Sequence, residues 1–169
     1  MFHSIFAILS ILIAWKWGDW RNWRLYYPTI LFVMFGDLIQ MIITYNYPLW
    51  TYNSSFTSHT IINLIVIFTV FPSFVILFIP RHPKNGIIKK GLYMLSLALL
   101  FTLIEWFSYL TRSFSYYHNW YIWYSLVFNI ILVSLIRIHY NDPRLAIPLA
   151  CTLGFGIVVL FKIPLSSIK

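Results

Sequence analysis

The sequence predicts an all-α polytopic membrane protein, with about six transmembrane helices in a single domain over residues 1–169. The first reason is composition. Hydrophobic residues make up 60% of the chain and charged residues 9%, against about 25% charged residues in ordinary soluble domains. A domain of this size cannot enclose so much apolar surface, so lipid must cover part of it. The second reason is that the apolar residues form long runs, and a helix needs about 20 of them to cross a hydrocarbon core of about 30 Å.

Each run predicts one membrane-spanning helix. The runs are too long and too uniformly apolar to be the strands of a β-barrel, in which apolar and polar residues alternate. They cover residues 2–17, 27–47, 60–79, 91–110, 120–138 and 145–163. The first run is short, and Gly154 and Gly156 interrupt the last one. The first run lacks a basic n-region and an A-x-A-like cleavage site, so we expect a retained span rather than a signal peptide. Pro72 frees a backbone carbonyl within the third run and predicts a kink there.

Basic residues gather in alternate links between these runs, which predicts how the chain lies in the membrane. The basic links are 16–26, 80–90 and 137–144. The other two links, 48–59 and 111–119, contain a single Lys or Arg residue, Arg112. The positive-inside rule therefore places the three basic links in the cytoplasm and both termini outside. Trp and Tyr residues crowd the ends of the runs, as expected for an interfacial belt.

The net charge of +8 comes from 12 Lys and Arg residues against 4 Asp and Glu residues. Because the basic residues lie in short links, no basic face is large enough for the phosphate contacts that nucleic-acid binding needs. We therefore expect membrane lipids as partners, with anionic headgroups as the counter-charge, and no nucleic acid. A partner membrane protein or a homo-oligomer is a further possibility. The single cysteine, Cys151, cannot form an internal disulfide.

Two of the four acidic residues fall inside apolar runs, where water should be absent. Asp37 lies in the second run and Glu105 in the fourth. A charged side chain at the bilayer centre costs about 2.5–3.5 kcal/mol, so such groups turn inward and find partners. We therefore expect both carboxylates to face a polar interior. For Asp37 we favour a functional role, because no basic residue lies within two turns of it on its helix.

Helical spacing adds other polar residues to these two carboxylates. It places Thr102, Glu105, Tyr109 and Arg112 on one face of the fourth helix, and His118, Ser125 and Asn129 on one face of the fifth. The candidate ligand-binding residues are Asp37, His59, Asn63, Glu105, Tyr109, Tyr117, His118, Trp120 and Asn129. Simpler roles stay open, since Asn63, Thr102 and Ser125 are of the type that bonds neighbouring helices together. Glu105 can also pair with Arg112 or a histidine.

Motifs for catalysis, metals and cofactors do not stand out in the sequence. His59, His118, Glu105 and Asp37 fall on different helices, and no H-E-x-x-H spacing joins such residues, so no metal centre is predicted. An aspartyl protease needs a second facing aspartate, and a serine hydrolase needs a G-x-S-x-G elbow. No Walker loop or Rossmann fingerprint is present. We therefore assign no catalytic residue and no cofactor.

A stretch of the chain resembles a family of small uncharacterised polytopic membrane proteins from spore-forming Bacillota. Its members typically show a span that ends in I-E-[YW], a short loop with Y-x-x-x-W, and an aromatic span that ends in Arg. The corresponding residues here are Ile104-Glu105-Trp106, Tyr116 to Trp120, and Arg137. The resemblance covers residues 26 to 143 and implies a bacterial cell membrane. It directs attention to Glu105, to Tyr116 or Tyr117, and to Trp120.

These observations favour a non-enzymatic membrane protein that binds, transports or senses a small ligand or cation in an outward-facing polar pocket. Asp37 and Glu105 would supply its negative charge, and His59 and His118 could titrate near neutral pH. Two alternatives stay open. The chain could be a structural or assembly protein that docks a partner in the membrane, or a membrane-embedded enzyme that acts on lipid.

Overall fold

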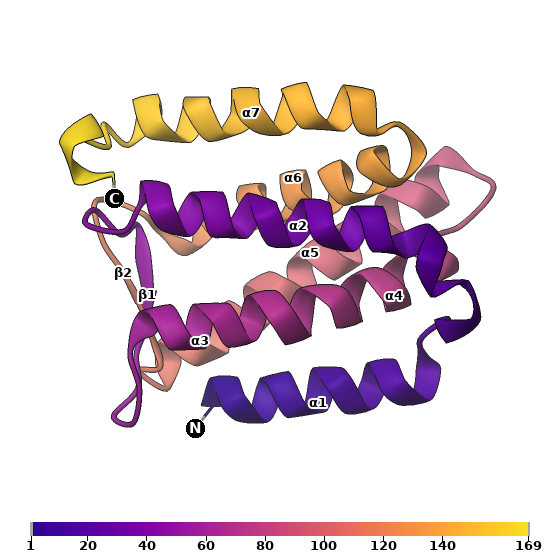
Figure 1. Ribbon diagram of the computed structural model, residues 1–169, viewed down its shortest axis with the longest axis horizontal. Coiled ribbons are helices and arrows are strands. Elements are labelled where there is room, and N and C mark those ends of the chain that lie inside the picture. Colours follow the sequence, from indigo (N-terminus) through magenta and orange to yellow (C-terminus); the bar gives the residue numbers. More distant parts are fainter. Residues whose placement is uncertain (1, 169) are drawn as a thin grey trace.

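The computed structural model describes residues 2–168, with the side chain of Phe2 excepted, and consists of helices that run back and forth along one direction (Figure 1). In chain order they are α1 (Phe2–Trp17), α2 (Trp23–Ile43), α3 (His59–Ile65), α4 (Phe71–Arg81), α5 (Ile87–Leu110), α6 (Ile122–Asn141) and α7 (Pro143–Leu160). Two short strands, β1 (Trp50–Tyr52) and β2 (Phe114–Tyr116), interrupt the series. Short 3₁₀ segments lie at Trp20–Asn22 and Leu165–Ser167.

A π-helical segment, η2 (Val66–Val70), joins α3 and α4 into one continuous helix. At its C-terminal end the Phe71 N–H donates to the Val66 carbonyl, five residues earlier. Pro72 follows directly and has no N–H to offer the carbonyl of Phe68, which an ordinary α-helix would pair with it. The disturbance predicted at Pro72 therefore takes the form of a wider helical turn.

Five helical stretches among the described residues have the length and hydropathy of membrane spans. They are Trp20–Ile43, His59–Arg81, Ile87–Leu110, Ile122–Asn141 and Pro143–Leu160. The shorter apolar helix α1 lies alongside them (Figure 1). The all-α polytopic class is thereby confirmed. The last span runs unbroken through Gly154 and Gly156, contrary to the interruption expected there.

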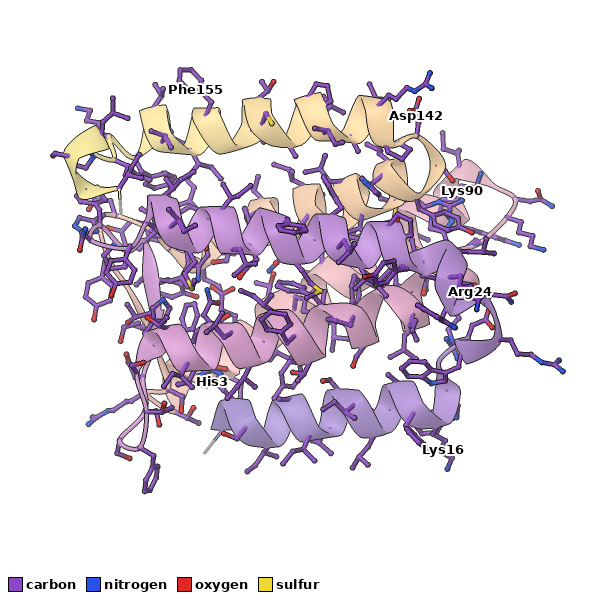
Figure 2. All side chains as sticks on the ribbon, in the orientation of Figure 1. His3, Lys16, Arg24, Lys90, Asp142 and Phe155 are labelled. Carbon is purple, nitrogen blue, oxygen red and sulfur yellow. The ribbon has the colours of Figure 1, made fainter. Side chains whose placement is uncertain are left out.

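The two ends of the bundle differ in character. α1 begins and α7 ends at the end that carries the two strands (Figure 1). Lys16, Arg24 and Lys90 lie at the opposite end (Figure 2). The basic links thus share one end of the molecule, as their alternation requires. That this end faces the cytoplasm stays a prediction of the positive-inside rule.

The largest departures from the sequence prediction lie in the two links at the strand end. α2 ends at Ile43 rather than near residue 47, and the links predicted at 48–59 and 111–119 contain β1 and β2. The strands pair antiparallel, with Trp50 opposite Tyr116 and Tyr52 opposite Phe114. Each strand has three residues, which is too few for the period-2 pattern that identifies strands. At the other end, α5 begins at Ile87, before the expected residue 91.

The buried core joins α1, α2, α4 and α6. Its members are Ala14, Tyr26, Ile30, Val33, Val75, Ile76, Phe78, Ile79, Val133 and Ile136. A smaller cluster of Leu49, Trp120 and Ile163 lies near the strands. The outward faces carry large exposed hydrophobic side chains, among them Phe155 on α7, which points away from α6 (Figure 2). A membrane would cover such a surface.

The corner between α1 and α2 is closely packed around Gly18. Its N–H donates to the Ala14 carbonyl at 2.7 Å, and the Trp20 indole N–H donates to the same oxygen at 2.7 Å. The Arg81 guanidinium donates to the Trp17 carbonyl and so joins the corner to the end of α4. A Cβ atom at Gly18 would lie 2.4 Å from the Ala14 oxygen and 2.5 Å from Ile76 Cγ2. The corner therefore has no room for a side chain.

The first prediction concerns this corner. Gly18→Ala should lower the free energy of unfolding by about 1–3 kcal/mol, because the added methyl group must displace packed backbone and side chain. Gly91→Ala is the matched control, since Gly91 lies within α5 and a Cβ atom there would meet no neighbouring atom within 4 Å. Thermal unfolding of the purified variants in detergent would measure both. Equal transition temperatures for the two variants would contradict the packing described here.

Candidate functional site

A cavity of about 130 Å³ lies inside the bundle, near the end that carries the strands. Helices α1, α2, α4, α5 and α6, segment η2 and both strands contribute to its wall. The polar groups on the wall come from His3, Asp37, Trp50, Tyr52, Glu105, Ser108 and Asn129. The rest of the wall is apolar, and much of it is aromatic. No Lys or Arg is among the described residues that line the cavity.

Glu105 of α5 is held by a hydrogen-bond network from two other elements. The Tyr116 hydroxyl donates to Glu105 Oε1 at 2.7 Å, and the Ser125 hydroxyl donates to the same oxygen. The Trp120 indole N–H in turn donates to Ser125 Oγ at 2.8 Å. Burial and the Glu105 carboxylate raise the pKa of Tyr116, which keeps the phenol protonated and able to donate. The chain therefore positions this carboxylate from β2 and α6 together.

The polar face predicted for α5 is shorter than expected and consists of Thr102, Glu105 and Ser108. Arg112, an expected partner of Glu105, lies beyond the C-terminal end of α5 with φ of 57° and is exposed. Tyr109 is 48% exposed and is absent from the described cavity wall. Because α5 ends at Leu110, helical periodicity no longer holds Arg112 on the face of Glu105.

Asp37 of α2 differs from Glu105 because one of its oxygens is left without a partner. Oδ2 is buried and accepts no hydrogen bond from the described residues. The Asn63 side chain of α3 lies beside the carboxylate. Buried polar atoms nearly always have a partner, so each exception calls for an explanation such as a bound ion or ligand. Asp37 is therefore the position on the cavity wall where a further group would be stabilised.

Tyr52 of β1 lies close to both carboxylates. Burial raises the pKa of the Tyr52 phenol, and the negative charges of Asp37 and Glu105 raise it further. The Tyr52 backbone N–H donates to His59 Nδ1 at 2.9 Å. His59, predicted as a ligand-binding residue, thus anchors β1 at the start of α3 and is absent from the described wall. It positions Tyr52 instead.

Asn129 of α6 lines the cavity and also bonds α5, through Thr102, for which the sequence left an interhelical role open. Its side-chain amide donates to Thr102 Oγ1 at 3.1 Å, which links α6 to α5. Thr102 in turn donates to the Ala98 carbonyl at 2.9 Å. This is the interhelical bond expected of such residues.

Three predicted residues lie in or near the loop that follows β2, and two of them lie on the outside. His118 and Tyr117 are exposed and are not part of the described cavity wall. His118 Nδ1 donates to the Pro48 carbonyl at 2.8 Å, and its ring stacks on Tyr47. The prediction that His118 shares a helical face with Ser125 was wrong, because α6 begins at Ile122. Trp120 is buried and acts on the site through Ser125.

The structure also adds residues that sequence reasoning did not single out. His3 lies at the start of α1 (Figure 2). It lines the cavity, and its Nε2 lies 2.7 Å from the Ser113 carbonyl. Trp50 and Tyr52 reach the cavity because β1 pairs with β2. A histidine near the start of a largely apolar first run was a usable signal. The strand pairing, in contrast, left no periodic pattern to find.

The fold and site together define a helical membrane protein with a carboxylate-bearing internal cavity. No protein-family model, curated protein or solved structure matches the chain. Among the described residues, no group of three or more His, Cys, Asp or Glu side chains is placed to hold a metal ion.

The second prediction tests the network around Glu105. Tyr116→Phe should lower the free energy of unfolding by about 1.5–3 kcal/mol, the usual contribution of a hydrogen bond to a charged group. Tyr109→Phe is the control, because this tyrosine packs against Tyr116 and is exposed, whereas the described donors to Glu105 are Tyr116 and Ser125. In a Glu105→Gln background the effect of Tyr116→Phe should shrink, and a double-mutant cycle of unfolding free energies would measure the coupling. A coupling of zero would contradict the network.

Proposed function

We propose that this protein binds a small cationic ligand in the cavity between α2, α5 and α6, as a membrane receptor or carrier. The observation that carries the proposal is the charge of the cavity wall. It holds two carboxylates, Asp37 and Glu105, and no basic residue other than His3 among its described residues. In a chain with a net charge of +8, two acidic groups are thus gathered where no lysine or arginine neutralises them.

Electrostatics favours a cation in such a place. Two opposite charges about 4 Å apart attract by about 4 kcal/mol at an effective dielectric constant of about 20, and more where water is excluded. Apolar walls around charges of one sign also focus the field and raise the local concentration of counter-ions. A cation that entered the cavity would neutralise part of the negative charge of Asp37 and Glu105.

Two other functions receive less support from the site. A purely structural role explains Glu105, whose Oε1 accepts two hydrogen bonds, but does not explain the unpartnered Asp37 Oδ2. Catalysis on a lipid would need an activated nucleophile, and the wall offers Ser108, whose hydroxyl already donates to the Ile104 carbonyl at 2.8 Å. Ligand binding accounts for both carboxylates.

The setting of this function follows from the topology prediction. The cavity lies toward the strand end, opposite the basic links, so the positive-inside rule would open it to the outside of the membrane. The resemblance to a family of Bacillota membrane proteins supports a bacterial cell membrane, with lipids around the apolar outer faces. A ligand arriving from outside the cell would then reach Asp37 and Glu105 from the strand end.

The third prediction uses the charge of a thiol reagent to test the cavity. In a Cys151→Ser background, Ser108→Cys places a thiol on the cavity wall, and Ser55→Cys places one in an exposed loop. For each variant we would measure the reaction rate with cationic 2-aminoethyl methanethiosulfonate and with its anionic 2-sulfonatoethyl counterpart. The ratio of the cationic to the anionic rate should be at least about tenfold higher for Ser108→Cys than for Ser55→Cys. This factor corresponds to about 1.4 kcal/mol in the difference between the activation free energies of the two reagents.

The carboxylates themselves provide the control for this experiment. Adding Asp37→Asn or Glu105→Gln to Ser108→Cys should move the ratio toward that of the loop variant, since each removes one negative charge with little change in shape. The same ratio for Ser108→Cys and Ser55→Cys would show that the cavity does not select cations, and the proposed function would then be abandoned.

A further inference from the structure

We infer that the ligand is a small organic ammonium ion with at least one N–H group and an apolar body, and not a metal cation. This inference rests on the proposed function and names the chemical class of ligand for the same cavity. Three features carry it: the unpartnered oxygen of Asp37, the shortage of free oxygen ligands, and the aromatic wall.

The Asp37 oxygen defines what the ligand must offer. An ionised carboxylate only accepts hydrogen bonds, and Oδ2 is buried with no donor from the described residues. A proton placed on Oδ2 would turn it into a donor that needs an acceptor of its own. An N–H group with a positive charge satisfies the oxygen fully, because a charged donor forms the shorter and stronger kind of hydrogen bond.

The cavity wall offers few oxygen ligands for a metal cation. Hard cations such as Ca²⁺ and Mg²⁺ take six or more oxygen ligands, from protein and water together. Here Glu105 Oε1 is already occupied by Tyr116 and Ser125, and the Ser108 hydroxyl is directed to the Ile104 carbonyl. Among the described residues, no group of three or more His, Cys, Asp or Glu side chains could hold a metal ion.

The aromatic side chains suit an organic cation instead. Trp50, Tyr52, Phe71, Phe101 and Phe128 all line the cavity. The face of an aromatic ring attracts a cation within about 6 Å, and this attraction is strongest when both are desolvated. The same rings offer apolar contact to a carbon body. An ammonium group near Asp37 could therefore be balanced by carboxylate and rings, while the rest of the ligand packs against the wall.

The size of the cavity limits the ligand to a small molecule. It measures about 130 Å³, and an apolar cavity of about 150 Å³ is known to hold a benzene molecule. An aralkyl or short alkyl amine is of this order. Because Oδ2 needs a donor, primary and secondary amines should bind more tightly than quaternary ammonium ions, which have no N–H. This ranking separates the inference from simple attraction of any cation.

Benzylamine is the probe for this inference, and the full chain purified in lipid nanodiscs is the sample. Isothermal titration and thermal unfolding would compare benzylamine with neutral benzyl alcohol, benzyltrimethylammonium and potassium chloride. We expect benzylamine to bind at least tenfold more tightly than benzyl alcohol or benzyltrimethylammonium, and potassium to leave the unfolding temperature unchanged. Benzylamine should also slow modification of the Ser108→Cys variant by the cationic thiol reagent.

Matched variants assign the binding to the cavity. Asp37→Asn should weaken benzylamine binding at least tenfold, whereas Asp142→Asn should leave it unchanged. Asp142 is exposed and caps α7 by accepting from the Arg144 and Leu145 N–H groups, and asparagine caps equally well. If Asp37→Asn does not fold, Glu105→Gln and Phe128→Leu serve in its place, each with an expected loss of several-fold.

The possible results separate this inference from the proposed function. Equal binding of benzylamine and benzyl alcohol, or binding that persists in Asp37→Asn, would overturn the amine assignment. So would stabilisation by potassium without stabilisation by benzylamine. In each of these cases a charge-selective Ser108→Cys reaction would leave cation binding in place. Loss of that selectivity would remove the proposed function itself.

Discussion

The absence of water inside a membrane is the constraint on which the rest of this structure depends. Every polar group within the bundle must find a partner from another helix or its own backbone. Thr29 and His139 meet across α2 and α6 at 3.1 Å, both buried, and Asn129 bonds Thr102 across α5 and α6. The same constraint makes an exception informative. A carboxylate oxygen left alone in such surroundings points to a group that the protein chain does not itself provide.

The two short strands bring polar side chains to the buried carboxylates at one end of the bundle. The antiparallel pair places Tyr52 and Tyr116 beside the carboxylates from segments far apart in the sequence, and the Tyr116 hydroxyl donates to Glu105. The Tyr52 N–H donates to His59 Nδ1 and so ties the pair to α3, and Asn53 Nδ2 donates to Ser115 Oγ at 2.7 Å and so ties the two strand segments to each other. Three aromatic residues of the strands, Trp50, Tyr52 and Phe114, thereby form part of the cavity wall.

Much of the fold could be predicted from the sequence, because span length and hydropathy are properties of local segments. The third run, 60–79, falls within the observed span His59–Arg81, and the inward turn of Asp37 and Glu105 followed from the cost of exposing charge to lipid. What could not be predicted depends on contacts between distant residues. The position of His118 was mistaken because helical periodicity was extended past the true start of α6. The role of Tyr116 rather than Tyr117 depended on which face of a three-residue strand meets Glu105.

The π-helical segment connects these local and distant features. Pro72 has no backbone N–H to donate, and the helix forms a wider, π-helical turn over Val66–Val70, just before it. Val66 and Val70, at the two ends of that turn, both line the cavity, and α1 packs against the same segment. Such turns are frequent at functional sites, since they change which side chains face inward without ending the helix. The π-helical turn thus forms part of the wall of the cavity whose unpartnered Asp37 oxygen gives the site its chemistry, so the irregular backbone and the unpartnered charge lie at the same site.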